Sequence, residues 1–105
     1  MNDSEFCERL EIETTVLKVW IERRWLVPPQ SAGHPDFDEA ELARARLIQD
    51  LVGPMGVNDD GVDVAMQLLD QVHGLRARLN RLAEAVRRQD AEVQRRILAV
   101  LDIDD

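Results

Sequence analysis

The chain has 105 residues, of which 45% are hydrophobic and 4% aromatic, so we expect one aliphatic, mainly helical core that needs no disulfide. Cys7 is the single cysteine, which excludes an internal disulfide and favours a reducing, cytoplasmic compartment. Residues 1–71 carry 15 acids against six bases, and residues 72–101 carry seven arginines against three acids; the acidic first part argues against nucleic acid or an anionic membrane as its ligand and favours basic partners.

A short first helix is predicted in "SEFCERLEI". Phe6, Cys7 and Leu10 fall at i, i+1 and i+4, so they share one helical face. Asp3 or Ser4 is the expected N-cap, because short polar side chains accept hydrogen bonds from the first turn.

A second helix follows after a tight turn, in "ETTVLKVWIERRW". Thr14 is its expected N-cap, and Leu17, Trp20 and Ile21 form an inward stripe. Pro28 cannot continue a helix, so this helix must end before it.

The segment 28–35 is predicted to be a loop, because it contains two prolines, Gly33 and no periodic apolar face. Short extended pieces at 26–27 and 36–37 are expected to pair as a minimal wing. A third helix then begins in "DFDEAELARARLIQDL", with Asp38 as its cap and Gly53 after its end. Its predicted buried side consists of Leu42, Ala45, Leu47, Ile48 and Leu51.

One long helix is predicted to begin with a cap at Asn58 or Asp59, and Gly74 is the helix-weakening residue in its interior before Val86. Its apolar residues recur in alternating steps of four and three, as in the seam of a coiled coil. We expect this seam to form the interface of a homodimer, through Val72, Leu75, Leu79, Leu82 and Val86. The pattern weakens through residue 100, so these last turns are expected to fray or fold back.

The predicted fold class is therefore all-α, with a winged helix-turn-helix-like head followed by a long coiled-coil helix. We place the head at residues 1–57, the long helix and dimerisation coiled coil at 58–101, and an acidic tail at 102–105.

Two sets of residues are candidates for binding a partner. Asp59, Asp63 and Asp70 fall on one helical face without a regular i+4 cation, so they could meet a basic helix of another protein. Capping and a solvated face are the ordinary alternatives for each of them. Val16 and Val19 face outward on the second helix, where exposed valines are unusual for an idle surface; the alternative is that the long helix covers them.

No catalytic, cofactor-binding or metal site is predicted, and neither is a small-molecule substrate. Cys7, His34 and His73 have no spacing typical of metal ligands and no evident means of converging. Cys7 is interpreted as a small buried hydrophobe, because free cysteine usually plays that role. We therefore expect a protein that is not an enzyme.

Binding to nucleic acid or to a membrane is not expected either. In the second helix, Lys18, Arg23 and Arg24 are balanced by neighbouring glutamates, and the wing has no arginine or lysine. The arginines of residues 76–96 surround the predicted seam, where such residues usually solvate a coiled coil. No apolar run approaches the length of a membrane span, and "MNDSEF" lacks the features of a signal peptide.

The order of these elements is similar to the MerR-type winged-helix architecture. More specifically, "EFCERLEIETTVLKVWIERRWLVP", "FDEAELARARLIQDL" and "GVDVAMQLLDQVHGLRARLNRL" resemble the chaperone-modulator (CbpM) family over residues 5–82. True MerR regulators typically have an arginine-rich wing, whereas the wing here is "QSAGHPDF". The resemblance implies a non-enzymatic inhibitor that binds the J-domain of a DnaJ-like co-chaperone of the CbpA type and restrains its action on the Hsp70 chaperone DnaK.

Two alternatives remain open from the sequence. The first is a MerR-like DNA-binding transcription regulator, in which the arginines of the coil or a surface created by dimerisation contact DNA. The second is an oligomerising scaffold that binds neither DNA nor a J-domain.

Overall fold

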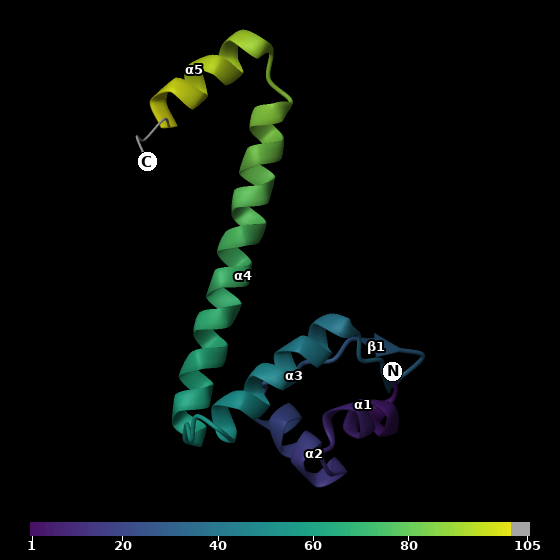
Figure 1. The fold of residues 1–105 in the computed structure, drawn as a ribbon. Coiled ribbons are helices and arrows are strands. Elements are labelled where there is room, and N and C mark those ends of the chain that lie inside the picture. Colours follow the sequence, from purple (N-terminus) through teal and green to yellow (C-terminus); the bar gives the residue numbers. More distant parts are fainter. Residues whose placement is uncertain (102–105) are drawn as a thin grey trace. The chain divides into compact units, whose positions relative to one another are not determined.

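The computed structural model describes residues 1–101; the predicted acidic tail, 102–105, lies outside the described residues. The described part is mostly helical, with a single small hairpin (Figure 1). This confirms an all-α fold with a long helix in its C-terminal half. The elements are α1 (Asp3–Leu10), α2 (Thr14–Glu22), β1 (Gln30–Ser31), β2 (His34–Pro35), α3 (Glu39–Val52), α4 (Asp59–Arg87) and α5 (Ala91–Leu101).

The chain divides into two compact units, and the division falls inside α4. We call residues 1–67 the first unit and the described residues from 68 onward the second unit. Within residues 1–101, no helix combines the length and the apolar character that a membrane span requires.

The N-caps of α1 and α2 differ from those predicted. Asn2 caps α1, because its Oδ1 accepts a hydrogen bond from the Glu5 amide at 2.9 Å. The prediction of Asp3 or Ser4 was therefore wrong, and Asp3 instead lies in the first turn, where the helix dipole favours a carboxylate. Glu13 precedes α2 without a side-chain capping bond, so the prediction that Thr14 is the N-cap was also wrong.

The two paired strands of the hairpin lie closer to the turn in sequence than predicted. Gln30 pairs with Pro35 and Ser31 with His34 in antiparallel register. The two residues between the strands, Ala32 and Gly33, have φ values of 53° and 80°, as a type I′ turn requires. The prediction that 26–27 pairs with 36–37 was wrong, because Leu26 and Phe37 turn into the core, where they are 0% and 1% exposed.

The helix α3 begins and ends as predicted. Asp38 caps it by accepting a hydrogen bond from the Glu41 amide at 2.9 Å, and Gly53 follows its last residue. Its buried residues are Leu42, Ala45, Ile48 and Leu51. Leu47 was expected among them but is exposed, because the buried stripe advances in steps of three and leaves position 47 to one side.

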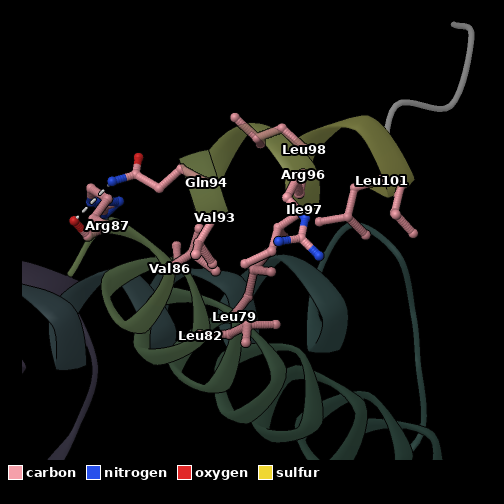
Figure 2. Close-up of a pocket in the computed structure, with 12 residues that line it drawn as sticks. Leu79, Leu82, Val86, Arg87, Val93, Gln94, Arg96, Ile97, Leu98 and Leu101 are labelled. Carbon is pink, nitrogen blue, oxygen red and sulfur yellow. Dashed lines mark hydrogen bonds between the residues drawn. The ribbon is translucent and has the colours of Figure 1, made fainter. Parts of the chain in front are cut away.

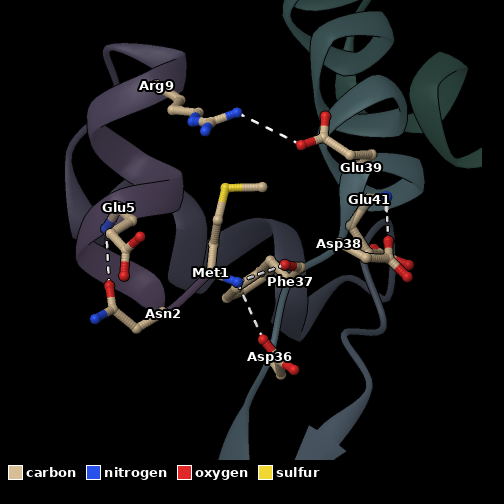
Figure 3. Close-up of polar contacts among 9 residues, drawn as sticks. All are labelled: Met1, Asn2, Glu5, Arg9, Asp36, Phe37, Asp38, Glu39 and Glu41. Carbon is tan, nitrogen blue, oxygen red and sulfur yellow. Dashed lines mark hydrogen bonds and ion pairs between the residues drawn. The ribbon is translucent and has the colours of Figure 1, made fainter.

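The core of the first unit joins all three of its short helices and the segment that enters α3. The rings of Phe6 and Phe37 stack with their centroids 4.1 Å apart. Across the same junction the Met1 ammonium group donates to the Phe37 carbonyl at 2.7 Å, and Arg9 pairs with Glu39 at 3.5 Å (Figure 3). These contacts hold α1 against the start of α3, and Trp20 is buried in the same unit.

The long helix α4 begins where the sequence predicted. The Asn58 side chain accepts a hydrogen bond from the Gly61 amide at 2.8 Å, and the helix then continues through Gly74 to Arg87. Beyond Val86, where the apolar pattern weakens, the chain forms a separate helix, α5. Asp90 caps α5 through the Val93 amide at 2.9 Å.

Candidate partner-binding surface

The first unit is strongly acidic. Residues 1–67 contain 14 acids and six bases, a net charge of −8. Arg9, Arg23 and Arg44 already contact other groups of the unit, since Arg9 pairs with Glu39 and Arg44 Nε donates to the Trp25 carbonyl. The unit therefore offers a negative field to a partner that approaches it.

Arg23 links the segment after α2 to the first turns of α4. Its Nη2 lies 3.5 Å from Asp63 Oδ2, and its Nη1 lies 3.9 Å from Asp59 Oδ2. The guanidinium group also lies over the Trp25 ring, 5.3 Å from the ring centroid, within range of a cation–π interaction. The helix itself offers these carboxylates no regular i+4 cation, and Arg23 supplies the positive charge from outside the helix.

Asp63 has a second internal partner in Trp25. The indole Nε1 donates a hydrogen bond to Asp63 Oδ1 at 2.6 Å, and the tryptophan is only 3% exposed. A buried indole N–H normally requires an acceptor, so Asp63 has a structural role whatever else it contacts. Asp59 is the more accessible carboxylate, with 67% of its side chain exposed against 38% for Asp63.

The structure therefore brings together two of the three predicted acidic residues. Asp59 and Asp63 meet around Arg23 in the first unit. Asp70, the third, is an exposed residue of the second unit.

Val16 and Val19 lie on the outer side of α2. They are 37% and 47% exposed, whereas Leu17 and Trp20 on the inner side are buried. The residues of α4 that belong to the first unit leave both valines exposed. Lys18 and Glu22 on this side are exposed as well, so it presents two apolar side chains, one cation and one carboxylate.

The hairpin has no arginine or lysine. Its residues from Gln30 to Pro35 include only His34 as a possible cation, and His34 is exposed. Because neutralisation of phosphates supplies most of the affinity for DNA, a wing of this composition contributes little to phosphate binding.

Cys7 is buried at 7% exposure, as its interpretation as a small buried hydrophobe predicted. Burial raises the pKa of its thiol, and the nearby Asp3 carboxylate raises that pKa further. The group is therefore a protonated thiol at neutral pH, not the thiolate that a nucleophile requires. Among residues 1–101, no three histidine, cysteine or acidic side chains are grouped so that they could hold a metal ion.

In the second unit, the predicted seam residues remain accessible. Val72, Leu75, Leu79 and Leu82 are between 42% and 63% exposed, and Val86 is half-buried beside α5. An accessible apolar seam on one helix is typical of a surface that associates with a second helix.

The chain has a helix pair, a hairpin and a third helix, followed by a long helix. This architecture can be compared with those of known protein families. A family model described as "MerR HTH family regulatory protein" matches residues 2–84. The chain belongs to this family. No curated protein and no solved structure matches it.

Proposed function

We propose that this protein is a non-enzymatic, cytoplasmic modulator that binds the J-domain of a DnaJ-like co-chaperone and inhibits its action on the DnaK-type chaperone. The observation that carries the proposal is the charge of the first unit. It has the helix-turn-helix and hairpin of a MerR-type head, but its net charge is −8 and its hairpin has no arginine or lysine. Such a head is repelled by DNA and attracts a basic protein surface.

Steric occlusion is the proposed mechanism. J-domains present a basic helix to Hsp70, so a modulator that occupies this helix prevents its contact with the chaperone. Asp59 and Asp63 at the start of α4, Asp70 further along it, and Val16 and Val19 on α2 are the proposed contact residues. Of the two proposed acids in the first unit, Asp59 has the more accessible carboxylate, and Asp63 is more buried and shares Arg23 with it.

Titration of the purified J-domain into the full chain tests this function. We expect binding that weakens as salt rises, because exposed charge pairs are screened over about 8 Å at physiological ionic strength. The double variant Asp59→Lys/Asp70→Lys should bind at least about tenfold more weakly, because like charges oppose each other across an interface. Asp63 is left unchanged so that the Trp25 hydrogen bond survives.

Asp50→Lys provides the control, since it introduces half the charge change of the double variant, one aspartate replaced by lysine, at an exposed position of α3. If binding depended only on the total negative charge, Asp50→Lys would weaken it by about the same factor per lysine as the double variant. Absence of J-domain binding by the unsubstituted chain at low salt would contradict the proposal.

A DNA-binding regulator is the second candidate, and family membership favours it as much as the modulator. Seven arginines in residues 72–101 provide its possible phosphate contacts. An electrophoretic shift assay at low salt separates the two functions. A regulator must retard DNA in a salt-sensitive manner, whereas the proposed modulator retards none.

A further inference from the structure

The carboxylates at the start of α4 are already paired with a cation of the same chain. Arg23 Nη1 lies 3.9 Å from Asp59 Oδ2, and Arg23 Nη2 lies 3.5 Å from Asp63 Oδ2. The guanidinium group also lies over the Trp25 ring, 5.3 Å from its centroid. Carboxylates and an aromatic face are groups that bind cations, so the chain's own arginine lies in a place suited to a cation of a partner.

Arg23 is held in this place by weak contacts. Both of its ion pairs are longer than the charge-assisted hydrogen bond of about 2.7–2.9 Å that arginine forms with a carboxylate in good geometry. Its Nε is buried and has no hydrogen-bond acceptor within residues 1–101. A second cation can therefore replace Arg23 at a carboxylate with little loss of hydrogen bonding.

Asp59 and Asp63 differ in how they meet a second cation. Asp63 accepts the hydrogen bond of the Trp25 indole at 2.6 Å, and only 38% of its side chain is exposed. The Asp59 side chain is 67% exposed and has the longer of the two ion pairs. Asp59 is therefore the carboxylate that a basic partner reaches first, and Arg23 is the cation with which that partner must compete.

The apolar groove of the second unit offers no comparable place for a cation within the described residues. It lies between the end of α4 and α5 and has a volume of about 850 Å³ (Figure 2). Leucine, isoleucine and valine side chains line it, and the charged side chains of its lining are Arg87 and Arg96. Because like charges repel, a basic partner is directed to the first unit and not to this groove.

We infer that Arg23 is an internal competitor, which occupies Asp59 in the free chain and must be displaced from it when a partner binds. This inference rests on the proposed function, which makes the partner a basic helix. A partner with one isolated cation merely exchanges one ion pair at Asp59 for another. A helix with several neighbouring cations also reaches the exposed Asp60, the next residue of α4. Arg23 therefore makes this surface selective for clustered positive charge.

Isothermal titration calorimetry of the full chain with the purified J-domain tests the inference. Arg23→Met removes the charge but keeps an unbranched, adaptable side chain over Trp25. We expect its dissociation constant to be at least about threefold lower than that of the unsubstituted chain, because nothing competes with the partner for Asp59. Arg23→Gln, which is also uncharged, replaces this variant if it does not fold. Arg23→Lys keeps the positive charge and should remain within about twofold of the original.

Arg9→Met is the matched control. Arg9 pairs with Glu39 at 3.5 Å at the junction of α1 and α3, so its replacement also removes one cation and releases one carboxylate of the first unit. It should leave the dissociation constant within about 1.5-fold of the original. An equal decrease in Arg9→Met and Arg23→Met would show an effect of total charge alone. An increase in Arg23→Met would show that Arg23 only holds Asp59 in position. Either result would overturn the inference.

A hexalysine peptide is the second probe, because it presents clustered positive charge without any other feature of a J-domain. We expect Arg23→Met to bind it at least about threefold more tightly than the unsubstituted chain, and Arg9→Met to bind it about as tightly as the unsubstituted chain. This result, together with no J-domain binding by any variant, would contradict only the proposed function. Equal or absent hexalysine binding by Arg23→Met and the unsubstituted chain would overturn the inference.

Discussion

The indole nitrogen of Trp25 donates a hydrogen bond of 2.6 Å to Asp63, a residue 38 positions further along the chain. Arg23 lies over the same indole ring and 3.5 Å from the other oxygen of Asp63. The three side chains therefore join the end of the helix-turn-helix to the first turns of α4. Asp63 keeps the buried indole N–H satisfied and the guanidinium group partly neutralised.

Replacement of Asp63 by alanine should destabilise the first unit. We expect Asp63→Ala to lower the free energy of unfolding by about 1–3 kcal/mol, because it leaves the buried indole N–H without its acceptor. Urea titration followed by tryptophan fluorescence measures this change. Asp50→Ala removes an exposed carboxylate from α3 and should change the free energy by less than about 0.5 kcal/mol. Equal losses in the two variants would show that the hydrogen bond contributes nothing specific.

Several features of the fold that are local in sequence could be predicted from the sequence, although the N-caps of α1 and α2 were not. Asp38 and Asn58 cap their helices as expected, because a cap and the amide that it satisfies are only three residues apart. The continuity of α4 through Gly74 is local too, since one glycine costs a helix only about 1 kcal/mol. The position of the hairpin was missed because tertiary packing decides it: Leu26 and Phe37 are more stable in the core than as a strand pair.

The candidate site could be predicted only in part, for the same reason. Helical spacing placed Asp59 and Asp63 on one face, and the structure keeps them together. Arg23, the cation that pairs with them, lies about 36 to 40 residues earlier in the chain. No local sequence pattern predicts a contact between residues so far apart. A buried tryptophan without an evident acceptor was the one available signal, because its N–H had to find a partner somewhere.

Two glycines should respond in opposite directions to replacement by alanine. Gly33 has a φ of 80°, so Gly33→Ala should lower the stability of the first unit by about 1 kcal/mol although no atom lies within 4 Å of the new Cβ. Gly74 lies inside α4, also with open space around it, so Gly74→Ala should stabilise that helix by about 1 kcal/mol. Urea titration measures the first change and thermal melting of helical circular dichroism the second. Changes of the same sign would contradict the conformational explanation.

The stacked pair of Phe6 and Phe37 should be among the most sensitive points of the core. Phe37 is 1% exposed, and Phe37→Ala should lower the free energy of unfolding by about 3–5 kcal/mol through lost burial and the cavity that remains. Phe37→Leu should lower it by less, and this variant remains measurable if the alanine variant does not fold. Val27→Ala provides the control, because Val27 is 66% exposed. A loss for Val27→Ala as large as that for Phe37→Leu would contradict the placement of Phe37 in the core.

Cys7 should make the stability of the first unit depend on alkaline pH. Burial raises the pKa of its thiol in the folded chain, and Asp3 adds to this rise. A group whose pKa is higher when folded contributes stability below its unfolded pKa, which is about 8.5. That contribution is lost as the pH rises through the folded pKa, because the unfolded chain then releases the proton more readily. The free energy of unfolding should therefore fall more steeply between pH 7 and pH 10 for the unsubstituted chain than for Cys7→Ala, which has no thiol to titrate.

Leu10→Ala is the control, because it changes the core but leaves the Cys7 thiol in place. It should keep the same pH dependence as the unsubstituted chain. Parallel curves for the unsubstituted chain and Cys7→Ala would show that the thiol has the same pKa in both states.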